Sequence, residues 1–139
     1  MSYATQQNLV TRFGADELIQ LTDLNNVGSI DAAVIAVALA DADAEINSYL
    51  AGRYNLPLTQ VSAELVRLAC DIARYRLFDV RATEAVKVRY DDAIKKLRDI
   101  GKGLASLGID EVGQAIAAAG DVQMVSGGRD FARPGRGNY

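Results

Sequence analysis

The sequence predicts an all-α protein, a compact helical bundle of two short N-terminal helices and three long helices, with an extended C-terminal tail. Half of the 139 residues are apolar, and along much of the chain they recur at spacings of three and four, the period of a helix. Only two prolines, Pro57 and Pro134, interrupt the chain. A chain of this length forms about one domain and buries enough surface for a hydrophobic core.

Two short helices open the predicted bundle. Thr5 can cap the first, which we expect to run to about residue 12 and to end at Gly14. Asp16 and Glu17 suit the first turn of the second helix, because acidic side chains are favoured at helix N-termini. This second helix should end near Leu21.

Three longer helices should follow, at about residues 32–51, 62–80 and 83–100. A side chain that can cap a helix stands at the start of each: Asp31, Ser62 and Thr83. The apolar stripes expected in the core are, helix by helix, Ile35, Leu39, Ala42, Ile46 and Tyr49; Leu65, Leu68, Ala69, Ile72 and Leu77; Val86, Tyr90, Ala93, Leu97 and Ile100. Two ion pairs are expected on the exposed surface of the last helix, Asp91 with Lys95 and Asp92 with Lys96.

The loop before the first long helix, "DLNNVGSID", resembles part of a calcium-binding loop. Asp23, Asn25 and Gly28 match the pattern D-x-[DN]-x-[DN]-G-x₅-E, but Val27 and Val34 occupy two positions that need oxygen donors. One of the missing donors is the bidentate carboxylate. We therefore predict a tight turn, followed by an aspartate that caps the next helix, and no metal site.

The composition excludes several kinds of catalytic site. The chain has no histidine, which removes Ser-His-Asp and Cys-His mechanisms and every histidine-ligated metal. The single cysteine, Cys70, cannot form an internal disulfide and lies in apolar sequence, so we expect a packed thiol. The sequence also lacks a glycine-rich phosphate loop. We predict that the protein is not an enzyme and that it uses no cofactor.

The sequence predicts no membrane segment. The first residues, "MSYATQQNLV", lack the basic start and the apolar run of a signal peptide. The most apolar segment, "AAVIAVALADADAEI", is interrupted by acidic residues well before the roughly 20 residues that span a bilayer.

The acidic residues of that segment form a cluster, Asp41, Asp43 and Glu45, outside the apolar stripe of their helix. Asp41 and Glu45 lie one turn apart on the same face. With no histidine and no second carboxylate motif, an acid-base or metal site is disfavoured. We interpret the cluster as a subunit contact, a charged face that meets arginines of a neighbouring copy.

Charge divides the chain into an acidic body and a basic tail. Residues 1–121 carry 12 basic and 17 acidic side chains, a net charge of −5, whereas residues 122–139 carry three arginines and one aspartate, a net charge of +2. The helical period also weakens after Gly101, where glycines become frequent. We predict a helical domain at residues 1–108 and a flexible Gly- and Arg-containing arm at residues 109–139.

The arm ends in "SGGRDFARPGRGNY", where arginines are separated by small residues and aromatics. Two interpretations are open: docking on a protein partner, or a small nucleic-acid-binding accessory protein that uses the Arg/Gly-rich tail. Three arginines bind nucleic acid only weakly at physiological salt, and specific nucleic-acid binding is not expected. We favour a protein partner, docked through Arg129, Phe131, Arg133, Arg136 and Tyr139.

Four stretches carry a family resemblance: "MSYATQQNLVTRFGADELIQLTD", "VALADADAEINSYLAGRYNLPL", "LVRLACDIARYRLFD" and "VRYDDAIKKLRDIGKGLASLG". Together, in unbroken order over about residues 1–108, they resemble the Mu-like prophage head-tail joining proteins. Family members often show a fuller "DxDGDGxID" turn and an aromatic-arginine ending. This chain departs at both places: Asn25, Asn26 and Val27 dilute the turn, and "RDFARPGRGNY" matches the ending only approximately.

The resemblance implies a structural protein of the phage neck, a head-tail connector or adaptor. Such a subunit is a helical bundle that forms a ring, by analogy twelve-fold, through which DNA passes. Its expected partners are further copies of itself, the portal protein, which the C-terminal extension reaches, and a tail-side neck protein, either a stopper or a tail terminator. Its expected location is the neck of the virion, with the host cytoplasm during assembly.

Overall fold

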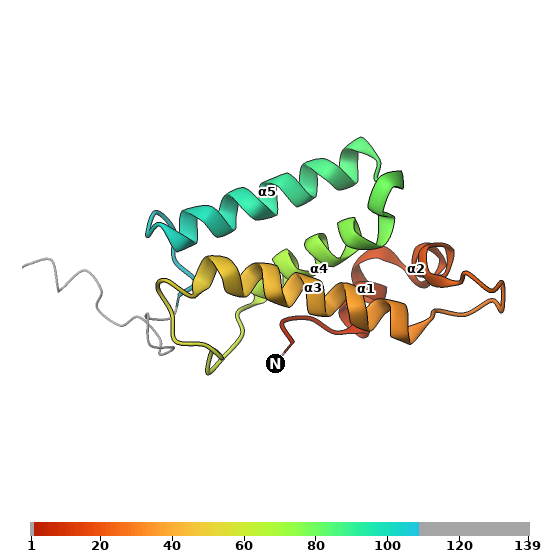
Figure 1. Cartoon of the computed structure of the whole chain (residues 1–139), viewed down its shortest axis with the longest axis horizontal. Coiled ribbons are helices and arrows are strands. Elements are labelled where there is room, and N and C mark those ends of the chain that lie inside the picture. Colours follow the sequence, from red (N-terminus) through yellow and green to blue (C-terminus); the bar gives the residue numbers. More distant parts are fainter. Residues whose placement is uncertain (1, 109–139) are drawn as a thin grey trace, which may run out of the picture.

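The computed structural model describes residues 2–108 and confirms the all-α fold (Figure 1). These residues form five α-helices and one 3₁₀ helix: α1 (Gln6–Phe13), α2 (Ala15–Thr22), α3 (Ala32–Leu50), α4 (Ala63–Phe78), η1 (Asp79–Arg81) and α5 (Glu84–Gly101). The two short and three long helices are those expected from the sequence. No helix in this described part is long and apolar enough to cross a membrane.

Side-chain caps begin four of the α-helices, as the sequence predicts. Thr5, Asp31, Ser62 and Thr83 each accept a hydrogen bond from a backbone N–H of the first turn. The helix α2 instead begins at Gly14, which has no side chain to offer and a φ of 91°. A positive φ is readily available only to glycine, and it lets the chain change direction sharply between α1 and α2.

The helix α4 lies at the centre of the bundle and contacts all four other α-helices. Figure 1 shows α3 and α5 running beside it in the opposite direction, while α1 and α2 lie together at one end of the molecule. The apolar stripe predicted for α4 is buried: Leu65, Leu68, Ala69, Ile72 and Leu77. Burial of this stripe against α3 and α5 removes apolar surface from water and so stabilises the bundle.

The stripes predicted for α3 and α5 are also confirmed, with a tyrosine at the edge of each. The aliphatic side chains of both stripes are buried, whereas Tyr49 and Tyr90 are only partly buried. A tyrosine suits this position because its ring packs on the core while its hydroxyl reaches a polar partner.

Two details differ from the prediction. The helix expected to reach residue 80 ends at Phe78, because Asp79 adopts a φ of 52° that cannot continue an α-helix. On α5, Asp91 pairs with Lys87 at 3.5 Å, and Lys96 lies 3.9 Å from Glu64 of α4. The predicted ion pairs of Asp91 with Lys95 and of Asp92 with Lys96 are therefore wrong.

The chain leaves the body at the end of the bundle opposite the α2–α3 loop (Figure 1). Arg53, just after α3, donates from Nη1 to the backbone oxygens of Ile100 and Ala105, at 2.8 and 3.2 Å. The N–H of Leu107 donates to the Tyr54 hydroxyl at 3.4 Å. These contacts hold the segment after α5 against the α3–α4 connection, so the body fixes the position of the last described residues.

Truncation of the central helix should test the role of α4. Ile72 is fully buried, so Ile72→Ala should lower the free energy of unfolding by about 2 to 5 kcal/mol, through lost apolar contact and the cavity that remains. Urea unfolding followed by circular dichroism measures the change. The matched control, Val88→Ala on the exposed side of α5, should stay within about 0.5 kcal/mol of the parent.

Candidate protein interaction site

The α2–α3 loop is held by local contacts from its two aspartates. The carboxylate of Asp23 accepts hydrogen bonds from the N–H groups of Val27 and Gly28, at 2.9 and 2.6 Å. Gly28 has a φ of 84°, which closes the turn. Asp31 accepts bonds of 3.0 and 3.4 Å from the first turn of α3. The predicted turn and cap are confirmed, and within residues 2–108 no three acidic or cysteine side chains gather as metal ligands.

Of the predicted acidic cluster, Asp43 faces the N-terminal segment. Its Oδ1 accepts a hydrogen bond of 3.0 Å from the N–H of Tyr3, whose hydroxyl donates to Asn47. Burial, and secondarily the charge of Asp43, raises the pKa of the Tyr3 hydroxyl. Asp43 therefore fixes the segment before α1 along the side of α3.

Glu45 points to another side of α3, toward α4 and α5. Its carboxylate pairs with Arg76 at 2.8 Å and accepts a hydrogen bond of 2.8 Å from the Tyr90 hydroxyl. The Tyr90 ring stacks on Tyr75 with 4.0 Å between ring centroids. Burial first, and then the bond to Glu45, raises the pKa of Tyr90 to about 12. Glu45 thus joins three helices within one copy.

The three acids therefore do not form one free patch. Asp43 and Glu45 are engaged within the bundle, whereas Asp41 is exposed at the edge of the apolar groove described below. The subunit contact stays a prediction, and Asp41 is the member of the cluster best placed to make it.

A cluster of arginines surrounds one buried carboxylate on the opposite side of α4. Asp71 is only 3 % exposed and has Arg89 at 3.0 Å and Arg67 at 3.6 Å. Despite these ion pairs, Asp71 Oδ1 accepts no hydrogen bond of good geometry in the described residues. Burial raises the pKa of Asp71, and this effect exceeds the opposing effect of Arg89 and the other arginines.

Arg74 belongs to the same cluster and ties α2 to α4. It makes a two-pronged contact with Glu17 of α2, at 2.8 and 2.9 Å, and its guanidinium lies 4.3 Å from the centre of the Phe13 ring. Paired, forked contacts of this kind are the more stabilising type of ion pair. Acidic Glu17, expected only to favour its helix N-terminus, therefore also makes a tertiary contact.

Cys70 is a packed thiol, as the sequence predicts. Its side chain is fully buried, and burial raises the pKa of the thiol to about 11. A thiol with so high a pKa is a poor nucleophile near neutral pH.

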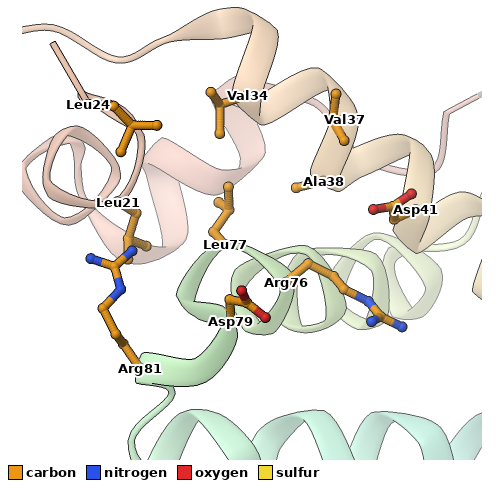
Figure 2. Close-up of a pocket in the computed structure, with 10 residues that line it drawn as sticks. All are labelled: Leu21, Leu24, Val34, Val37, Ala38, Asp41, Arg76, Leu77, Asp79 and Arg81. Carbon is orange, nitrogen blue, oxygen red and sulfur yellow. The ribbon is translucent and has the colours of Figure 1, made fainter.

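An apolar groove of about 390 Å³ lies between α2, α3, the end of α4 and η1 (Figure 2). Leu21, Ala38 and Leu77 are its buried floor, and Leu24 and Val37 stand at its mouth, 74 % and 63 % exposed. Charged side chains of both signs frame it: Asp41, Arg76, Asp79 and Arg81. Exposed apolar side chains around a groove with a charged rim are typical of a protein interaction site.

Sequence reasoning missed both the groove and the arginine cluster. The groove had one weak signal, since Val37 and Val80 are apolar but lie outside the predicted stripes. In the cluster, only the i,i+4 spacing of Arg67 and Asp71 was visible in the sequence, because Arg89 comes from another helix.

The predicted docking residues of the tail lie outside the described residues: Arg129, Phe131, Arg133, Arg136 and Tyr139. The same holds for the predicted flexible arm at residues 109–139.

Comparison with known proteins places the chain in a phage family. Residues 3–126 match the family described as Bacteriophage Mu, Gp36. The chain belongs to this family. It is 37% identical over 131 residues to Mu-like prophage FluMu protein gp36 of Haemophilus influenzae, covering 94% of this chain and 93% of the relative. It is 35% identical over 139 residues to Gene product J of Escherichia phage Mu, covering 99% of both chains.

The predicted resemblance to Mu-like prophage proteins is confirmed at the level of the family. The match extends beyond the described body to residue 126, and so includes the first half of the predicted arm. Neither relative's name states a role in joining head and tail.

Asp71→Asn should test the cost of the buried carboxylate. Burial raises the pKa of Asp71 in the folded state above its usual value of 3.8. Protonation of Asp71 therefore stabilises the fold fully below pH 3.8, and this stabilisation is lost as the pH rises through the folded-state pKa. The neutral amide should therefore leave the free energy of unfolding at pH 7 equal to the parent or higher by about 1 kcal/mol.

Urea unfolding of parent and variant between pH 3 and pH 7 measures this difference, which should shrink toward low pH. The matched control is Asp92→Asn, which changes an exposed aspartate of α5. A loss of about 3 kcal/mol or more in Asp71→Asn at pH 7 would contradict the prediction, because the arginines would then outweigh burial.

Proposed function

We propose that this protein is a structural protein of the virion, a head-tail connector in the phage neck. In this proposal, copies of the helical body form a ring, by analogy twelve-fold, between the portal and a tail-side neck protein. DNA passes through the lumen, and the arm of residues 109–139 docks on the portal. The protein works by assembly and not by catalysis.

The observation that carries the proposal is the family match over nearly the whole chain. Both relatives are proteins of phage Mu or of a Mu-like prophage, and the alignments cover 93% and 99% of their lengths. A small helical protein of such a phage, with no histidine for acid-base chemistry, suits an assembly role better than an enzymatic one.

The geometry of the body supports a two-ended connector. The apolar groove opens near the α2–α3 loop, and the arm leaves from the opposite end, where Arg53 and Tyr54 hold the chain. A subunit with separate contact sites at its two ends can contact two different neighbours in the assembly.

Surface charge supports a ring in which one face of a copy meets a different face of the next. Asp41 lies beside the groove, near Arg76, whereas Arg67, Asp71 and Arg74 face the other way on α4, about half a turn from Arg76. An exposed acid on one face and arginines on the opposite face favour head-to-tail contacts, and such contacts close into rings when the rotation allows. In such a ring, Asp41 of one copy contacts arginines of the next copy, such as Arg89, whose side chain is 48% exposed.

The acidic body suits a lumen that DNA must pass. Residues 1–121 carry 12 basic and 17 acidic side chains, so the ring repels phosphates and does not retain them.

Deletion of residues 127–139 should abolish binding to the portal and leave the body folded. The deletion removes the arginine and aromatic anchors, but it leaves every described contact and the family-matched region intact. Co-sedimentation with purified portal rings of the same phage measures binding, and circular dichroism checks the fold. Phe131→Ala alone should weaken binding at least about tenfold, as for a buried aromatic anchor, whereas Asn138→Ala should not.

The alternative, a nucleic-acid-binding accessory protein, makes the opposite forecast. If it is right, the full chain should retard DNA in a gel strongly at 50 mM salt and much less at 200 mM salt. The chain that lacks residues 127–139 should not retard DNA at all. If the protein is a connector, neither the full chain nor the shortened chain should retard DNA appreciably. Unchanged portal binding after the deletion, together with a tail-dependent gel shift, would overturn the connector proposal.

A further inference from the structure

The apolar groove needs a cover that the described body does not supply. Its floor of Leu21, Ala38 and Leu77 is buried, but Leu24 and Val37 stand exposed at its mouth, and Val80 beside it is 92 % exposed. Large apolar side chains gathered at one opening favour association, because a partner removes them from water together. The rim carries two acids and two arginines, so its net charge is zero. Such charges orient a bound chain but do not attract it from a distance.

The chain carries a segment with the right chemistry beyond the described residues. Val112, Ile116 and Ala119 recur at spacings of four and three, so a helix in this region would present them on one face. Val122, Met124 and Val125 continue the apolar character. The segment lies within the family match, which ends at residue 126, whereas the arginine-rich ending lies outside it. An apolar stretch that belongs to the family region fits an apolar groove of the body better than the charged ending does.

The point of exit limits how much of the segment can reach the groove of its own copy. The chain leaves the body beside Tyr54, beyond the end of α3, whereas the groove contacts α3 at Val34 to Asp41. From residue 41 to the end of α3 is about 15 Å of helix, and from residue 34 about 25 Å. Four extended residues from Gly108 to Val112 span at most about 14 Å. Val112 therefore falls short of most of its own groove, which only the later residues of the segment can reach, whereas a groove on another copy can accept the whole segment from Val112 on.

We propose that the apolar groove of one copy binds the segment of residues 112–125 of a neighbouring copy, and that this exchange links the subunits of the ring. The inference rests on the proposed ring and names the contact that closes it. The arginine-rich residues after 126 then remain free to reach the portal.

Disulfide trapping between two differently tagged full-length chains tests this contact. One chain carries Val37→Cys at the mouth of the groove, and the other carries Ile116→Cys in the segment. The native Cys70 is fully buried and stays in both chains. The two chains are mixed under mild oxidation, alone and with portal rings, and run on a non-reducing gel. We expect a covalent dimer that carries both tags, at least about tenfold more abundant than with Val88→Cys of α5 in place of Val37→Cys.

Two results overturn the proposal. One is that the dimer with both tags is absent, or is no more abundant with Val37→Cys than with Val88→Cys, both alone and with portal rings. The other comes from a chain with both Val37→Cys and Ile116→Cys: an internal disulfide whose yield does not depend on dilution would place the segment in the groove of its own copy.

A charge in the groove separates this inference from the proposed function. Val37→Glu should reduce the mass measured by light scattering from the assembled ring to single copies, whereas Val88→Glu should leave it unchanged. Melting followed by circular dichroism checks that both variants fold. Because residues 127–139 are intact, Val37→Glu should still co-sediment with portal. If the unsubstituted chain does not bind portal, the proposed connector is refuted. If Val37→Glu assembles as the unsubstituted chain does, only the groove contact is refuted.

Discussion

The fold depends on covering every side of α4. One side of this helix is an apolar stripe that needs both α3 and α5, while the other presents Arg67, Asp71 and Arg74. A buried aspartate is tolerated only where cations surround it, and these come from α4 itself and from Arg89 of α5. Since Arg74 reaches Glu17, the same polar side also draws α2 onto the bundle. The short N-terminal helices are therefore an integral part of the body.

The same arrangement gives the molecule two chemically different ends. At one end, α2, the start of α3 and η1 leave an apolar groove, because the α-helix α4 stops at Phe78 and Asp79 turns the chain away. At the other end, Arg53 and Tyr54 fix the segment that follows α5. Gly101 is required there, since a Cβ at this position would lie 2.7 Å from the backbone oxygen of Tyr49. A body with one open end and one fixed exit fits the connector proposed above.

Local signals in the sequence were sufficient for the elements and the core. Capping side chains such as Asp31 and Ser62 act on their own first turn, and apolar spacing of three and four depends on the helix alone, so both can be recognised without knowledge of the fold. The ion pairs of α5 show the limit of this reasoning. Lys96 lies near Glu64 of the neighbouring helix, a contact that spacing within α5 cannot reveal.

The sequence by itself determined the helical class, the helix starts, the buried stripes and the membership of a phage family, because each depends on the order of residues along the chain. Only the tertiary structure decided how the polar residues are used. It divided the cluster of Asp41, Asp43 and Glu45 among three surroundings, assembled arginines of different helices around Asp71, and left Leu24 and Val37 exposed beside one groove. The physical reason is that such contacts join residues far apart in the sequence, from 18 positions for Asp71 and Arg89 to 40 for Tyr3 and Asp43, and their pairing follows from how the helices pack.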